Sequence, residues 1–130
     1  MPKEESKKHY DLEERTAKFG EDAIVFCRQL PKDEITKRII PQLIGCTTAI
    51  GANYCEADCA ESNKDFIHKM AIANKEAKES KHFLRMVSKA CPEFTSEARR
   101  LWKEAHELNL IFMTIIKRAK ETENRKGIQQ

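Results

Sequence analysis

Apolar residues recur at alternating spacings of four and three positions in four separate segments of this 130-residue chain. That spacing places the apolar residues on one face of an α-helix. Each segment keeps the seven-residue period over about three heptads, which is typical of helices packed in a left-handed bundle. The segments run from Asp11 to Leu30, from Ile39 to Ala60, from Ser62 to Cys91 and from Thr95 to Ala119. The pattern therefore predicts an all-α fold with four helices.

The breaks between the segments are short and carry residues that start and stop helices. A proline follows the first and the third segment, and the spacing of a capping box is present at Asp11–Glu14 and at Ser62–Asp65. Short connections make consecutive helices antiparallel neighbours, so we expect an up-down-up-down bundle over residues 11–119. A polar arm at residues 1–10 and a polar, frayed tail at residues 120–130 would flank it.

The composition agrees with a helical protein, since the chain has only four Gly and four Pro. No apolar run approaches the roughly 18 residues of a membrane span, and the first ten residues are too polar for a signal peptide. The five cysteines are expected to be reduced and mostly buried, which favours a cytoplasmic protein. The expected core consists of Leu12, Phe19, Phe26, Leu43, Ile50, Phe66, Leu84, Leu101, Leu108, Phe112 and Ile115.

The last segment has more apolar residues than one helix face can hold, because residues 110–116 are apolar nearly all round. A helix that is apolar on both faces is buried on both, and a four-helix monomer covers only one. We therefore expect a subunit interface on the second face. The alternative is that this helix buries a wider face inside its own bundle. The expected interface residues are Trp102, Leu110, Met113 and Ile116.

The third segment is basic, with seven basic and three acidic residues between Ser62 and Ala90, a net charge of +4. Several of its cations fall on one seven-residue line, about 200° away from the apolar line, and should face solvent. One-sided charge of this kind favours contact with nucleic-acid phosphates, although charged lines are often only solvated surface. The expected nucleic-acid-binding residues are Lys64, Lys75, Lys78, His82, Arg85 and Lys89.

Polar residues near the apolar lines of the second and third segments allow two interpretations. Asn53, Glu56, Glu76 and Glu79 would form a polar network beside the core or at a subunit contact, with Asn53 as a buried amide that fixes the register or as a ligand contact. Glu79 and His82 also have the Glu-x-x-His spacing of di-iron bundles, but no second copy follows. We expect neither metal nor cofactor. No phosphate-binding loop or nucleophile motif is present, so we also expect no enzyme.

Three stretches of the chain resemble a known family: Ile50-Gly51-Ala52-Asn53-Tyr54-Cys55-Glu56-Ala57, Ser62 through Asp65-Phe66-Ile67, and Ile72-Ala73-Asn74-Lys75-Glu76-Ala77-Lys78-Glu79. With these motifs, the region from about Tyr10 to Ile116 is similar to the four-helix bundle proteins of the 23S rRNA-intervening-sequence, or S23, family. The resemblance implies an antiparallel four-helix bundle that assembles as a homopentamer. The family name refers to genes found inside intervening sequences of ribosomal RNA, and it names no reaction.

The family is related to the accessory variability protein of diversity-generating retroelements, a basic pentamer that binds nucleic acid and a reverse transcriptase. The resemblance thus implies three kinds of partner: further copies of this chain, RNA or DNA, and a reverse transcriptase or another protein. We expect a non-enzymatic, nucleic-acid-associated module. The alternative is a protein-interaction scaffold that binds no nucleic acid.

Overall fold

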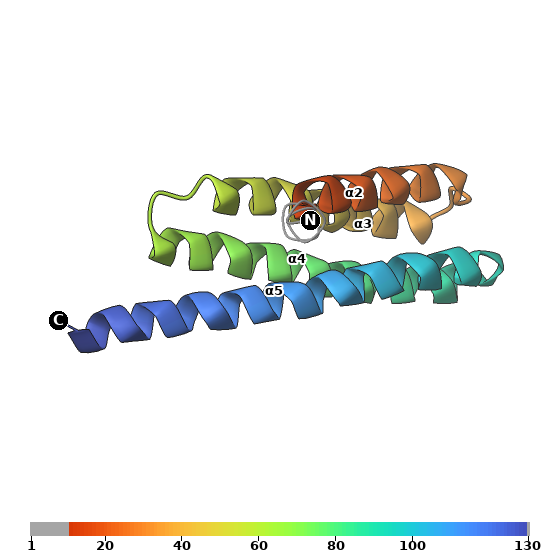
Figure 1. Cartoon of the computed structure of the whole chain (residues 1–130). Coiled ribbons are helices and arrows are strands. Elements are labelled where there is room, and N and C mark those ends of the chain that lie inside the picture. Colours follow the sequence, from red (N-terminus) through yellow and green to blue (C-terminus); the bar gives the residue numbers. More distant parts are fainter. Residues whose placement is uncertain (1–10, 130) are drawn as a thin grey trace, which may run out of the picture.

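The computed structural model describes residues 11–129 and is helical almost throughout (Figure 1). The helices are α2 (Leu12–Gln29), α3 (Thr36–Asp58), α4 (Asn63–Ala90) and α5 (Thr95–Gln129), with a short 3-10 turn at Pro92–Phe94 before α5. Consecutive helices are antiparallel, which confirms the expected all-α, four-helix fold. The seams between α3 and α4 and between α4 and α5 are the most extensive, and the seam between α2 and α5 is the least. None of the helices in the described part of the chain is long and apolar enough to cross a membrane.

The structure confirms one of the two predicted helix caps and corrects the predicted end of α5. Ser62 caps α4 as expected, because its Oγ accepts a hydrogen bond from the amide of Asp65 at 3.0 Å. The capping box predicted at Asp11 does not form, since the Asp11 side chain makes no cap hydrogen bond. The frayed tail is also wrong for residues 120–129, which continue α5. Five of residues 120–126 are Lys, Glu or Arg, which are good helix formers, and neither Gly nor Pro is among the seven, so propensity extends the helix beyond its apolar pattern. The polar arm expected at residues 1–10 lies outside the described residues.

Helix α3 begins three residues before its predicted start at Ile39. The Asp33 carboxylate accepts hydrogen bonds from the amides of Ile35 and Thr36, at 2.9 and 3.0 Å. These bonds satisfy amide groups that have no partner inside the helix. The charged group also stabilises the positive end of the helix dipole. Sequence periodicity missed this start because the first residues of α3 are held by a polar turn and not by the apolar line.

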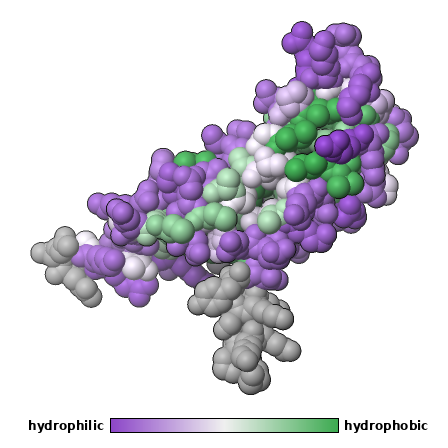
Figure 2. All heavy atoms as spheres, turned by 90° about the horizontal axis from the view of Figure 1, so that it is seen from above, coloured by the Kyte–Doolittle hydropathy of each residue, from purple (hydrophilic) through white to green (hydrophobic). Residues whose placement is uncertain are grey.

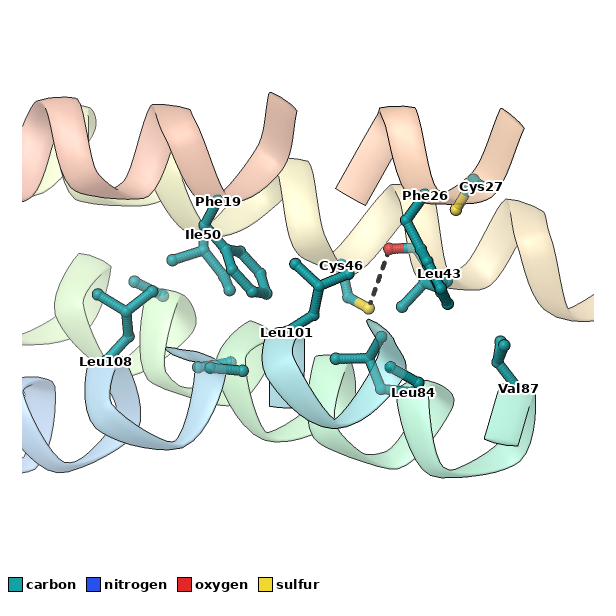
Figure 3. Close-up of a cluster of buried hydrophobic side chains, with 14 of the residues drawn as sticks. Phe19, Phe26, Cys27, Leu43, Cys46, Ile50, Leu84, Val87, Leu101 and Leu108 are labelled. Carbon is teal, nitrogen blue, oxygen red and sulfur yellow. Dashed lines mark hydrogen bonds between the residues drawn. The ribbon is translucent and has the colours of Figure 1, made fainter. Parts of the chain in front are cut away.

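The core occupies the space between the four apolar lines (Figure 3). Phe19 and Ile50 face Leu101 and Leu108 across the bundle, and all four are at most 2% exposed. Nine of the eleven predicted core residues are buried, all except Phe66 and Ile115.

All five cysteines are free, and the buried ones are Cys27, Cys46 and Cys91. The Cys46 Sγ donates a hydrogen bond to the Leu43 carbonyl, the dashed line in Figure 3, and burial raises the pKa of the Cys27 thiol to about 11.

Phe66 and Ile115 are half-buried because the helices differ in length. Helix α2 has 18 residues and α5 has 35, or about 27 and about 52 Å. Figure 1 shows α3, α4 and α5 extending past the start of α2, so three helices form that end of the described structure. Both side chains pack against the core from this three-helix end. The apolar pattern identified their inward direction but not the missing fourth helix.

Candidate nucleic-acid interface

The residues that border the α4–α5 seam lie one position after a core residue of either helix. This position is at the edge of the packed face, so a long side chain lies partly over the core and reaches water with its polar end. On α4 these residues are Asn74, Lys78, Lys81, Arg85 and Ser88. On α5 they are Arg99, Trp102, His106, Asn109, Met113, Ile116 and Lys120.

Two hollows lie along this seam. We call the first the Trp102 hollow; it measures about 470 Å³ and is lined by Leu84, Arg85, Ser88, Thr95, Ala98, Arg99, Trp102 and Lys103. We call the second the Met113 hollow; it measures about 590 Å³ and is lined by Ala71, Asn74, Lys78, Met113, Ile116, Lys117, Lys120, Glu121 and Asn124. Both combine an apolar floor with long basic side chains.

The charge along the seam has one sign. The two hollows and the polar residues between them contain seven Lys or Arg side chains and a single carboxylate, that of Glu121. None of the seven forms an ion pair with any residue of the described part of the chain. They are Lys78, Lys81, Arg85, Arg99, Lys103, Lys117 and Lys120. The α4–α5 face, as we call this set with its two hollows, therefore has a positive potential that its own acids do not balance.

The α2–α5 seam shows the opposite arrangement. Arg15 donates hydrogen bonds to both carboxylate oxygens of Glu104, at 2.7 and 2.8 Å, and a third to Glu107 at 2.7 Å. These partners raise the pKa of Arg15, with the Glu104 hydrogen bond as the largest cause. A cation held this way is already neutralised inside the bundle. The contrast sets the α4–α5 face apart from an ordinary charged surface.

A polar network crosses the seam between the two hollows. Lys81 Nζ lies 3.1 Å from the Oδ1 of Asn109 and 3.1 Å from the Nδ1 of His106. Asn109, only 4% exposed, donates its own Nδ2 hydrogen bond to Asn74. The ring of Trp102 stacks on His106 with centroids 5.0 Å apart, and Lys81 Nζ lies 5.4 Å from the Trp102 ring centroid. The network fixes an ammonium group and an indole side by side at the centre of the face.

Comparison with known proteins identifies the family. The family model of the 23S rRNA-intervening sequence proteins matches residues 8–108. The chain belongs to this family. It is also similar to the crystal structure of a protein of unknown function from the S23 ribosomal protein family of Bacteroides thetaiotaomicron VPI-5482. That similarity has a TM-score of 0.71 and 26% sequence identity, and it covers 81% of this chain and 97% of the other. No curated protein matches the chain.

The matched family region contains the whole Trp102 hollow, whose lining runs from Leu84 to Lys103. The α5 residues of the Met113 hollow lie beyond residue 108, outside that region. The family membership supports the fold and the S23 assignment. The relation to the accessory variability protein stays a prediction.

All six basic residues singled out from the sequence are exposed. Two of them border a hollow, Arg85 in the Trp102 hollow and Lys78 in the Met113 hollow. The other four, which line neither hollow, are Lys64, Lys75, His82 and Lys89. Lys75 Nζ lies 3.8 Å from a carboxylate oxygen of Glu76. The line predicted on α4 thus overlaps the α4–α5 face at two positions.

Sequence reasoning missed the five other cations of the α4–α5 face. Lys81 lies on the line one position after the core of α4, and Arg99, Lys103, Lys117 and Lys120 come from α5. The signal was present in part, because Arg99 and Lys120 each follow a core position of the last segment. The lines of α4 and α5 taken together identify Lys81, Arg99 and Lys120, but not Lys103 or Lys117, which lie one position further along α5.

The predicted interface residues differ in exposure. Leu110 and Met113 are 50% and 49% exposed, Trp102 is 37% exposed, and Ile116 is half-buried.

The structure has a second apolar surface that the sequence did not predict. Ile24, Val25 and Ile35 are 39%, 56% and 62% exposed, near the end of α2 and the start of α3. Figure 2, which views the bundle from above, shows hydrophobic atoms gathered at the end away from the C-terminus.

Within one chain the structure does not join Asn53, Glu56, Glu76 and Glu79 into one network. Asn53 is half-buried, and its Nδ2 donates to the Ala49 carbonyl of its own helix at 2.9 Å. The Oε1 of Glu56 lies 3.6 Å from the Nζ of Lys69. Burial, together with the nearby Glu79 carboxylate, raises the pKa of Glu76. The buried amide between helices is Asn109 and not Asn53. Within residues 11–129 there is no group of three or more His, Cys, Asp or Glu side chains that could hold a metal ion.

Proposed function

We propose that this chain is a non-enzymatic, cytoplasmic module that binds the phosphate backbone of RNA or DNA through its α4–α5 face. The observation that carries the proposal is the set of seven cations facing a single carboxylate, none of them paired with a described residue. A polyanion gains affinity at such a surface by releasing its condensed counterions. Contacts with phosphates position a protein without reading sequence, so we expect weak sequence preference. Five free cysteines support a reducing compartment.

Charge-reversal variants on two faces test the proposal. Lys78→Glu with Arg85→Glu places two acids on the α4–α5 face, whereas Lys37→Glu with Arg38→Glu makes the same change in net charge on α3. All four side chains are exposed, so neither double variant should unfold the bundle. Fluorescence anisotropy of a labelled 20-nucleotide RNA at ~50 mM salt should show affinity falling at least about tenfold for the first and less than about threefold for the second. Equal losses of RNA affinity in the two double variants would show that only the net charge of the protein matters, which would contradict the proposal.

We further propose that the chain assembles into a homo-oligomer, with the pentamer implied by the family resemblance as the expected state. Two unlike apolar surfaces support it. One contains Leu110 and Met113 on α5, and the other contains Ile24, Val25 and Ile35 near the end of α2 and the start of α3. Surfaces that differ in shape meet head to tail, and head-to-tail contacts generate rings when the rotation closes. In this arrangement Leu110 and Met113, with Ile116 beside them, pack on the next subunit. Nucleic acid then contacts the Met113 hollow only through the cations at its edge, which are Lys78, Lys117 and Lys120. Trp102 stays with the basic residues of its hollow.

A protein-interaction scaffold is the second candidate, and one surface favours it. A groove of about 370 Å³ between α2 and α3 is lined by the acids Glu13, Glu14 and Glu21, with Gly20 and Gly51 among its small residues. This surface suits a basic segment of a partner protein, and a reverse transcriptase is the partner that the resemblance implies. Wild-type protein that retains no RNA or DNA, but binds such a partner, would favour the scaffold.

A further inference from the structure

We infer that the Trp102 hollow receives an unpaired nucleobase, so that the ligand of the α4–α5 face is a single-stranded nucleic acid. This inference rests on the proposed function and names its substrate class. The six basic residues predicted on α4 include no Trp, Tyr or Phe on which a base could stack. The aromatic residue of the site comes from the neighbouring helix instead.

The hollow has the chemistry of a base site with phosphates beside it. Its floor is apolar, since Leu84 and Ala98, each only 1% exposed, line the hollow together with Trp102. Its rim carries three exposed cations, Arg85 from α4 and Arg99 and Lys103 from α5. A flat, weakly polar ring with an anion on either side matches this combination of apolar floor and cationic rim. The volume of about 470 Å³ lies within the ordinary range of small-ligand pockets.

Trp102 is held in place from the side away from the hollow. His106, one turn later on α5, stacks on the indole with an interplanar angle of 16°, and Lys81 Nζ lies 5.4 Å from the ring centroid. Neither residue lines the hollow, whereas Ala98 and Arg99, one turn earlier, both do. The indole thus presents its other side to the hollow, backed by a histidine that is itself fixed by Lys81. A platform fixed before binding loses little conformational entropy when a base stacks on it.

A duplex does not satisfy this site. The bases of a double helix are stacked on one another, so their faces are not available to a side chain without unpairing. A single strand offers every base face at no such cost. The rim cations would bind either form, which makes the indole the feature that separates single strands from duplexes.

The chain contains one tryptophan, so its fluorescence reports on Trp102 alone. Three probes of equal length separate the contributions at ~50 mM salt: single-stranded oligo-dT, an abasic oligomer with the same phosphates, and a duplex. Oligo-dT should bind most tightly and quench the fluorescence. The abasic oligomer and the duplex should bind about tenfold more weakly and leave the fluorescence nearly unchanged. Binding of all three with equal affinity and no quenching would overturn the inference and leave the proposed function standing, whereas binding of none would overturn both.

Substitutions at Trp102 provide the second measurement, by anisotropy of labelled oligomers. Trp102→Leu removes the stacking face and should lower affinity for oligo-dT about tenfold, while affinity for the abasic oligomer stays within about twofold. Trp102→Tyr keeps an aromatic face and should restore most of the lost affinity. Unchanged oligo-dT binding in Trp102→Leu, with the helix content of the wild type by circular dichroism, would overturn the inference. So would equal losses for oligo-dT and the abasic oligomer, because a structural role of Trp102 affects both.

Discussion

Lys81 on α4 donates a hydrogen bond to Asn109 on α5, with 3.1 Å between Nζ and Oδ1. Asn109 donates in turn to Asn74, so one buried amide connects two positions of α4. The pair lies between the Trp102 hollow and the Met113 hollow and ties together the helices that carry their cations. The bond thereby links the stability of the seam to the arrangement of the α4–α5 face.

The first prediction concerns this amide. Asn109→Ala removes the partner of both Lys81 and Asn74, and it should lower the free energy of unfolding by about 1–3 kcal/mol in urea denaturation. Asn53→Ala is the matched control. Asn53 is half-buried and bonds to a carbonyl of its own helix, so its loss should cost less than about 1 kcal/mol. Equal losses of unfolding free energy at the two positions would show that the hydrogen bonds across the seam contribute no more to stability than a hydrogen bond within one helix.

The second prediction concerns the centre of the core. Phe112 has no exposed surface and stacks on Tyr54, with ring centroids 6.4 Å apart. Phe112→Ala leaves a large cavity and should lower the free energy of unfolding by roughly 3–5 kcal/mol. Ile115→Ala, at the half-buried three-helix end, should cost distinctly less in the same urea titration. A loss below about 1 kcal/mol for Phe112→Ala would contradict the packing of α5.

The third prediction concerns the start of α3. Hydrogen bonds from the amides of Thr36 and Ile35 lower the pKa of Asp33 below its ordinary value. A carboxylate whose pKa is lowered by folding stabilises the protein above the pKa of the unfolded chain, and that stabilisation disappears as pH falls through the folded value. Asp33→Asn keeps an acceptor oxygen but loses the charge, so it should be less stable than wild type near pH 7. The difference in Tm should shrink as pH falls from about 5 to about 2, and a constant difference across that range would contradict the account.

The fourth prediction concerns assembly. Light scattering at tens of micromolar should return a species several times heavier than the 15.1 kDa chain. Met113→Glu places a charge on the exposed apolar surface of α5 and should dissociate this species while circular dichroism shows unchanged helix content. Gln42→Glu adds the same charge at an exposed position of α3 and should leave the mass unchanged. A wild-type mass of about 15 kDa would refute the oligomer.

The sequence was sufficient for the four helices and most of the core because those properties depend on one helix at a time. Phe19, Leu84 and Phe112 lie on apolar lines and are buried where the lines predict. The start of α3 depends on a polar turn at Asp33, and the half-burial of Phe66 depends on the length of another helix. Neither the start of α3 nor the half-burial of Phe66 can be predicted from the apolar spacing of the helix on which it occurs.

The candidate site was predictable only on one side of the seam. Lys78 and Arg85 belong to a line of α4 that the sequence alone identifies. Their neighbours Arg99 and Lys103 come from α5, and the register that brings them to Arg85 follows from packing. The amide that crosses the seam could not be identified for the same reason, since Asn109 lies beside the apolar line of its helix while Asn53 lies on one.

Nucleic-acid binding through the α4–α5 face should weaken steeply as the salt concentration rises, because this binding depends on phosphate contacts. Affinity for a single-stranded oligonucleotide is measured from ~50 to ~300 mM NaCl, and its logarithm is plotted against the logarithm of the salt concentration. Each phosphate neutralised on a single strand contributes a slope of about −0.7. Four to seven of the cations on the α4–α5 face therefore predict a slope between about −3 and about −5. A slope near zero, or no binding at ~50 mM salt, would contradict the account.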